Sequence, residues 1–215
     1  MEVFILVTGP YEENCLIVYP GSGDEVLVVD PGDDAEGIVE WLKARGWRPA
    51  LYLLTHGHID HVSGLAEVHR EFPAPVAMHP ADEVWAFTDL AALPPYYEKP
   101  ESPGPAERKL ADGQAWTDLG LRYEVMGTPG HSPGGVAFYF PEEKVVLSGD
   151  SLFAGSIGRS DLPLADPPQL SRSLDRLMEL PDEVVVYPGH GPTTTIGGER
   201  RTNPYLRDRR WAGEG

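Results

Sequence analysis

The chain has a single cysteine, Cys15, among its 215 residues. One cysteine excludes an intrachain disulfide framework and cannot supply the several thiolates of a typical structural zinc site. Cys15 lies in the apolar run Cys15–Tyr19. We therefore expect its side chain to be buried and to act as a small hydrophobe.

Long apolar runs are also missing. No run in the sequence approaches the ~20 residues that a transmembrane helix needs. The N-terminal residues Met1–Ile5 lack the basic start of a signal peptide, and their apolar run is brief. These absences predict a cytoplasmic protein with no membrane partner.

Basic residues are scarce. Seventeen Lys and Arg residues stand against 34 Asp and Glu residues, which gives a formal charge of −17. Nucleic-acid binding depends on surplus Lys and Arg at phosphates, and anionic membranes attract the same residues. The composition therefore predicts neither partner. The basic segment Arg200–Arg210 is expected to be a solvated helix.

The remaining composition is that of a globular protein, with 41% hydrophobic residues. The length suits one sizeable core, so we expect a single domain over residues 1–215. Apolar runs and helical patterns predict a layered α/β fold with two β-rich halves and helices outside. The expected strands are Val3–Val7, Cys15–Tyr19, Val26–Val29, Leu51–Leu54, Val76–Met78, Leu121–Met126, Val136–Phe140, Val145–Leu147 and Val184–Tyr187. The expected helices are Ala35–Arg45 capped by Asp33 or Asp34, Gly64–Phe72 capped by Ser63, Ala81–Phe87, and Pro167–Leu180 capped by Asp166.

A loop is expected over Leu93–Pro105, because five prolines in this stretch exclude regular structure. It either covers a site with Tyr96 and Tyr97 or lies on the surface.

The most informative segment is Thr55–His61, with the sequence Thr-His-Gly-His-Ile-Asp-His. It places three of the seven histidines directly after an apolar strand. Neutral imidazole is the commonest protein ligand for metals of the zinc type, and Asp60 adds a carboxylate oxygen. Gly57 is expected to relieve crowding between adjacent ligands. A His-rich surface loop without a metal leaves this clustering unexplained.

Three further segments repeat one design, in which a strand is followed by glycine and then by a candidate ligand. They are Val125–His131, Val145–Asp150 and Val184–His190. Any one of them alone is an ordinary turn, but three make coincidence improbable. The other two histidines, His69 and His79, are expected to be solvated or packed rather than ligands.

The candidate donors number seven, which exceeds the four of a tetrahedral structural zinc site. They suit two ions that share a bridging carboxylate and a water, as in catalytic dinuclear sites. The donors are His56, His58, Asp60, His61, His131, Asp150 and His190.

These residues resemble those of the metallo-β-lactamase superfamily and, within it, the glyoxalase II-like hydrolases. The resemblance extends over nearly the whole chain and includes Gly149–Phe153, Gly158-Arg159 and Glu199–Pro204. It implies a four-layer αββα sandwich, with the helical C-terminal domain of glyoxalase II largely absent. It also implies a ligand set in which His56, His58 and His131 hold one metal, Asp60, His61 and His190 hold the second, and Asp150 bridges them.

The resemblance implies hydrolysis of an acyl thioester such as S-lactoylglutathione or a related 2-hydroxyacyl thioester. Two metals lower the pKa of a shared water, and the resulting hydroxide attacks the thioester carbonyl. Asp60 would orient the water, and Arg159 would hold an anionic part of the substrate. At two positions where the family's thiol-binding pattern has tyrosine, this chain has Asp161 and Pro192. The identity of the thiol carrier is therefore left open.

Other members of the superfamily supply the alternatives. Persulfide dioxygenases resemble the chain closely, and they use one iron on two histidines and an aspartate, here His56, His131 and Asp150. A nucleic-acid-processing member is disfavoured by the charge of −17. The donor set accepts zinc, which is favoured, as well as iron or manganese, and the sequence leaves the oligomeric state open.

Overall fold

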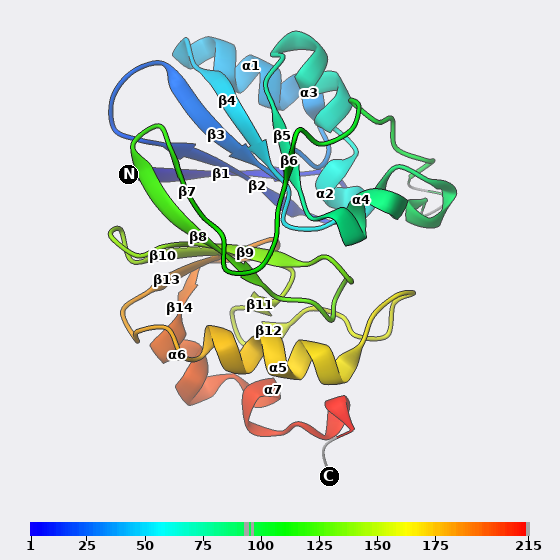
Figure 1. Ribbon diagram of the computed structural model, residues 1–215, viewed down its shortest axis with the longest axis vertical. Coiled ribbons are helices and arrows are strands. Elements are labelled where there is room, and N and C mark those ends of the chain that lie inside the picture. The colour runs from blue at the N-terminus through cyan, green and yellow to red at the C-terminus, as the bar shows by residue number, and fades with distance from the viewer. Residues whose placement is uncertain (93–94, 96, 214–215) are drawn as a thin grey trace. The chain divides into compact units, whose positions relative to one another are not determined.

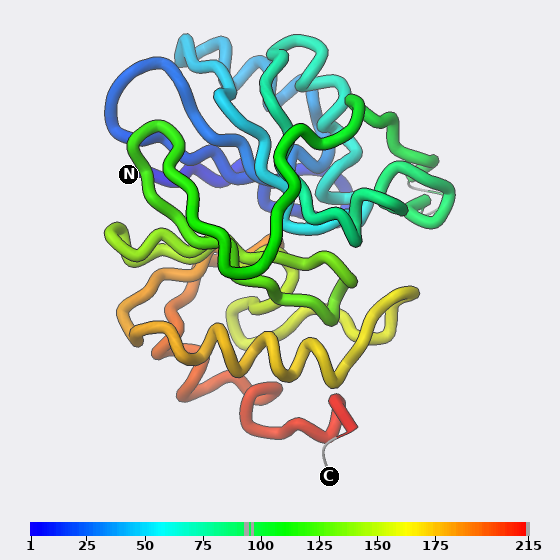
Figure 2. Tube along the Cα trace, in the orientation of Figure 1, coloured from blue at the N-terminus to red at the C-terminus, as the bar shows by residue number. Residues whose placement is uncertain are grey.

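A computed structural model describes residues 1–92, 95 and 97–213 of the chain. The chain folds into two compact units. Unit 1 consists of residues 1–110 and 117–121, and unit 2 of residues 111–116 and 122–215. The single domain expected over residues 1–215 stays a prediction. Along the chain, unit 1 occupies the blue-to-green part of the trace and unit 2 the green-to-red part (Figure 2).

Unit 1 is built around a six-stranded sheet. Its strands are β1 (Glu2–Thr8), β2 (Glu13–Tyr19), β3 (Glu25–Val29), β4 (Arg48–Leu53), β5 (Val76–Met78) and β6 (Arg108–Lys109), in that spatial order. Its helices among the described residues are α1 (Ala35–Arg45), α2 (Ile59–Val62), α3 (Leu65–Glu71), α4 (Pro80–Ala86) and the 3-10 helix η1 (Asp89–Ala91).

The first three strands form the expected antiparallel meander, and β3, β4 and β5 are parallel to one another. Helices α1 and α3 lie against this sheet (Figure 1) and contribute Ile38, Leu42, Leu65 and Val68 to its core. Each of these four side chains is at most 1% exposed, and burying a Leu, Ile or Val side chain stabilises a fold by about 1.5–3 kcal/mol.

Unit 2 contains most of a second six-stranded sheet, in the order β14-β13-β10-β9-β8-β7. Its strands are β7 (Ala115–Asp118), β8 (Leu121–Gly127), β9 (Val136–Phe140), β10 (Val145–Gly149), β13 (Val185–Pro188) and β14 (Thr194–Thr195). A separate hairpin pairs β11 (Leu152–Phe153) with β12 (Ser156–Ile157). The helices described here are α5 (Pro167–Leu177), α6 (Ile196–Thr202), α7 (Pro204–Arg207) and the 3-10 helix η2 (Arg210–Ala212).

Helix α5 (Figure 1) buries a stripe of Leu170, Leu174 and Leu177 in the core of unit 2. Asp166 caps this helix by accepting the N–H of Gln169 at 2.9 Å, as expected. The helix ends at Leu177, three residues before the expected end.

Two local expectations are wrong, and a third is confirmed only in part. Asp34 is the N-cap residue of α1, as expected, but it lies in the left-handed region (φ 50°) and its side chain makes no capping bond. Ser63 ends α2 instead of beginning α3, because its hydroxyl donates to the carbonyl of Gly32. The segment 200–210 is not one solvated helix, since it divides into α6, α7 and η2 and Arg209 bonds the Ser171 hydroxyl at 2.8 Å.

None of the helices in the described part of the chain combines the length and the apolar character needed to cross a membrane. The fold is thus the mixed α/β fold expected from the sequence.

Cys15 is fully buried in β2, as predicted. Burial raises the pKa of its thiol well above the usual value, and the acidic groups of Glu13 and Asp30 raise it further. Because the thiolate is the reactive form, we predict that native Cys15 reacts with Ellman's reagent at least about 1000-fold more slowly than a free thiol. Unfolding in guanidinium chloride should release one reactive thiol per chain. Rapid labelling of the native protein would contradict the placement of β2.

Candidate functional site

In each sheet the residues of the candidate site follow strands that run in the same direction. Strands β3 and β4 are parallel, and they lead into Asp30 and Thr55–His61. In unit 2, β10 is parallel to β13, and both β8 and β10 are antiparallel to β9. The carboxyl ends of β8, β10 and β13 therefore share one edge of the sheet, where His131, Asp150 and His190 follow. The direction of the strands thus explains why the candidate residues of each sheet lie close to one another.

The four predicted donors of unit 1 form one cluster. The ring of His56 lies 4.9 Å from that of His58 and 4.1 Å from that of His61, centroid to centroid. Helix α2 places Asp60 beside His61, with 3.9 Å between Oδ2 and Nε2. His56 and His61 are buried, whereas His58 and Asp60 are partly exposed. A cluster with two buried and two accessible donors suits a site that solvent can reach.

Asp30 lies beneath this cluster and was missed by the sequence analysis. Its carboxylate accepts the N–H and the hydroxyl of Thr55, at 2.7 and 2.5 Å, and lies 3.0 Å from Nδ1 of His61. A carboxylate at Nδ1 holds the ring proton there and leaves the Nε2 lone pair for a metal. Asp30 thus orients the ring of His61. The signal that points to it is an acidic residue directly after the apolar strand Val26–Val29.

Helix α4 supports the same loop from another side. The N–H of Gly57 donates to Oδ2 of the buried Asp82 at 2.9 Å, and the Trp85 ring lies 5.3 Å from that of His58. A Cβ added to Gly57 would lie 2.9 Å from Cβ of Ala86. Packing against α4 therefore requires glycine here, and the expected relief of crowding between His56 and His58 stays a prediction.

The three predicted donors of unit 2 form a second cluster. Nε2 of His131 and Nε2 of His190 each lie 3.5 Å from Oδ2 of Asp150. The three side chains are 7%, 24% and 10% exposed, respectively. Two imidazoles and a carboxylate offer the donor types that zinc, iron or manganese accept.

The orientation of His131 has a defined cause. Its Nδ1 lies 2.8 Å from the carbonyl oxygen of Arg159, which can only accept a hydrogen bond. Nδ1 therefore carries the proton, and Nε2 keeps its lone pair toward Asp150. The Arg159 side chain is 67% exposed and forms two hydrogen bonds of 3.0 Å with Asp161.

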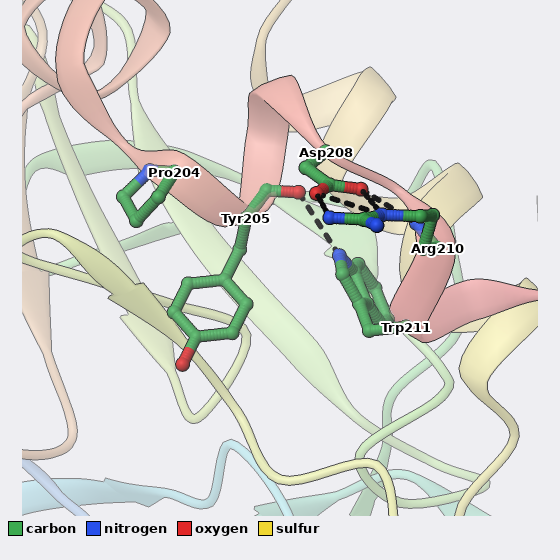
Figure 3. A pocket seen from close by; sticks show the side chains of 5 residues that line it. All are labelled: Pro204, Tyr205, Asp208, Arg210 and Trp211. Carbon is green, nitrogen blue, oxygen red and sulfur yellow. Dashed lines mark hydrogen bonds and ion pairs between the residues drawn. The ribbon is translucent and has the colours of Figure 1, made fainter.

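A pocket of about 260 Å³ adjoins Arg159. It is lined by Ser156–Asp161 together with Tyr205 and Trp211. The same two aromatic residues also line a pocket of about 410 Å³ with Pro204, Asp208 and Arg210, in which the Asp208–Arg210 pair flanks the indole of Trp211 (Figure 3). Aromatic surface beside guanidinium groups suits a ligand that is partly apolar and carries a negative charge.

The remaining histidines have structural roles, as expected. His69 lies in α3 with its ring 5.9 Å from that of Tyr52, and His79 caps α4 by accepting the N–H of Ala81 at 3.1 Å. In the loop predicted over 93–105, residues 93, 94 and 96 lie outside the described part of the chain. Tyr97 is buried, and its hydroxyl donates to Asp33 at 3.1 Å. Burial and this carboxylate raise the pKa of the Tyr97 hydroxyl.

Comparison with known proteins defines the family. The model of the metallo-beta-lactamase superfamily matches residues 8–190, and the chain belongs to this superfamily. A curated relative from Haemophilus influenzae, hydroxyacylglutathione hydrolase GloC, is 30% identical over 212 residues, which cover 97% of this chain and all of the relative.

Two solved structures are similar over nearly the whole chain. TTHA1623 in a di-iron-bound form is 45% identical with a TM-score of 0.86, over 95% of this chain and 100% of that one. The BLEG-1 B3 metallo-beta-lactamase is 36% identical with a TM-score of 0.90, over 96% and 100%. The metallo-β-lactamase fold implied by the sequence is thereby confirmed.

We predict that Asp30→Ala lowers the free energy of unfolding by about 2–4 kcal/mol, because it leaves buried donors of Thr55 and His61 without their acceptor. Asp30→Asn should cost less, since Asn keeps one acceptor oxygen and tolerates the positive φ of 49°. Urea unfolding measures both. The control is Asp24→Ala, whose carboxylate is 63% exposed and should matter by less than about 0.5 kcal/mol. Equal losses of stability in Asp24→Ala and Asp30→Ala would refute the assignment of Asp30 as the buried acceptor for Thr55 and His61.

Proposed function

We propose that this protein is a metal-dependent hydrolase of acyl thioesters, of which 2-hydroxyacyl thioesters such as S-lactoylglutathione are the expected type. The observation that carries the proposal is the pair of donor clusters, each with a histidine oriented through Nδ1 by a fixed oxygen. A GloC relative supports the choice of a thioester.

The seven donors are proposed to hold two divalent ions. The chemistry of the set fits, because it offers imidazole nitrogens and carboxylate oxygens and no thiolate, which suits zinc, iron or manganese. The di-iron form of a relative 45% identical to this chain supports iron as an alternative to zinc. The proposed assignment is His56, His58 and His131 for one ion, Asp60, His61 and His190 for the other, and Asp150 for both.

When bound, the ions would supply an acidified water as nucleophile and a Lewis acid for the carbonyl oxygen. Asp60, which is 14% exposed, would accept a hydrogen bond from the attacking water and orient it. The leaving thiol has a reference pKa of about 8.5 and would depart as a thiolate, so no side chain would have to act as general acid. This matches a set of histidines that are all assigned as ligands.

The thiol half of the substrate is proposed to occupy the pocket of Arg159, Tyr205 and Trp211. The guanidinium of Arg159 would exchange its exposed partner Asp161 for a carboxylate of the substrate, at small cost because exposed ion pairs are weak. The two rings would cover apolar parts of the carrier.

A metal analysis combined with a thioester panel tests the proposal. We predict two ions per chain and hydrolysis of a 2-hydroxyacyl thioester, with turnover abolished in Asp60→Ala and His61→Ala. His69→Ala, a histidine outside both clusters, should keep both activity and metal. Chelation should lower the melting temperature, because a ligand that binds only the native state stabilises it.

Two results would reject the thioesterase proposal. Fully metallated protein that turns over no acyl thioester contradicts it directly. One iron per chain, with oxygen uptake on a persulfide, would identify the dioxygenase alternative.

For the pocket, we predict that Arg159→Ala raises KM about 10-fold and changes kcat little, since it removes binding to a part of the substrate that does not react. Asp161→Ala should leave KM unchanged or lower it, because it frees the guanidinium. Arg122→Ala, another exposed arginine paired with a carboxylate, serves as the control. Steady-state kinetics with one thioester measure all three. An unchanged KM in Arg159→Ala would contradict the proposal that the thiol half of the substrate binds in this pocket.

A further inference from the structure

Glu199 is a buried carboxylate of unit 2 that does not belong to the proposed ligand set. Its side chain lies in α6, and the residue is 3% exposed. Oε2 accepts the N–H of Gly155 at 2.9 Å and Nδ2–H of Asn203 at 2.8 Å, and Oε1 accepts the hydroxyl of Thr194 at 2.6 Å. Three hydrogen-bond donors thus converge on one buried side chain.

Asn203 extends the same network. It is fully buried, and its Nδ2 also donates to the carbonyl of Ser156 at 2.9 Å. Its Oδ1 accepts the N–H of Tyr205 at 3.0 Å, which caps α7. Gly155 and Ser156 belong to the β11–β12 hairpin, so Glu199 and Asn203 together hold the turn of that hairpin by two backbone groups.

Both ends of this hairpin lie beside proposed ligands. The chain enters it directly after Asp150 and leaves it through Gly158 and Arg159. The N–H of Gly158 donates to the carbonyl of Ser151 at 3.3 Å, and a Cβ at Gly158 would lie 1.8 Å from the carbonyl oxygen of Asp150. The next carbonyl, that of Arg159, accepts from Nδ1 of His131 at 2.8 Å. A displacement of the hairpin would therefore move the acceptor of the His131 proton.

We propose that Glu199 and Asn203 are positioning residues, which fix the β11–β12 hairpin so that the Arg159 carbonyl holds the Nδ1–H tautomer of His131. Residues that orient the second nitrogen of a metal-binding histidine typically change metal affinity by about 10–100-fold. This role deepens the proposed function, since it concerns the metal affinity of the same site.

Matched variants separate hydrogen-bond geometry from other effects. In Glu199→Gln the amide oxygen can replace Oε2, and the amide nitrogen can donate to the Thr194 hydroxyl, so the network is kept. Glu199→Ala removes the bonds to Gly155, Thr194 and Asn203. In Asn203→Asp an oxygen replaces Nδ2 and faces two acceptors, while the bond to the N–H of Tyr205 is kept. Leu174→Ala, a core substitution in α5, lowers stability without touching the network.

The primary measurement is the ¹⁵N NMR signature of the histidine rings in the full-length, metal-free protein. We expect wild type and Glu199→Gln to carry the His131 proton on Nδ1, and Glu199→Ala and Asn203→Asp to lose this tautomer. Zinc affinity, measured by chelator competition on the full chain, should fall about 10–100-fold in those two variants only. Leu174→Ala should melt at a lower temperature with the tautomer and the affinity unchanged.

Two outcomes would overturn the role. The first is an unchanged tautomer and zinc affinity in both Glu199→Ala and Asn203→Asp. The second is an equal loss in Leu174→Ala, which would reduce the effect to general stability. A wild-type protein that binds no metal would instead reject the proposed function, and the tautomer measurement on the metal-free protein distinguishes the two failures.

Discussion

The proposed chemistry depends on which ring nitrogen of each buried histidine carries the proton. An imidazole offers a lone pair to a metal only if its other nitrogen holds the proton, and a buried N–H needs an acceptor. His61 meets this condition through the Asp30 carboxylate and His131 through the Arg159 carbonyl, at 3.0 and 2.8 Å. Each acceptor is itself fixed, Asp30 by Thr55 and Arg159 by the hairpin that Glu199 and Asn203 hold.

Glycine has the same role in both units, where it allows two backbone segments to approach closely. A Cβ at Gly32 would lie 1.8 Å from the carbonyl oxygen of Asp60, and a Cβ at Gly158 would lie 1.8 Å from that of Asp150. Only glycine permits so close an approach of two backbone segments. The backbone of each proposed carboxylate ligand is therefore packed closely against a glycine, which limits the reorganisation that metal binding would require.

The sequence predicted the elements and donors that local pattern determines. Apolar runs predicted β2, β9 and β10. The pattern of a strand followed by glycine pointed to His131, Asp150 and His190, and the structure brings these side chains together because β8, β10 and β13 run in one direction. Contacts between residues far apart in the sequence could not be predicted from local patterns. Asp30 acts through residues 25 and 31 positions away, Glu199 through Gly155, 44 positions away, and nothing local to either residue records those partners.

The central claim is that donors of both clusters bind the same pair of ions. Anomalous diffraction from crystals of the metal-loaded protein tests it most directly. The account predicts two peaks about 3.5–4 Å apart, with histidine nitrogens of His61 and His131 at about 2.0–2.2 Å from the metals and Asp150 contacting both. A single ion held by residues of one cluster alone, with the other three or four donors uncoordinated, would contradict it.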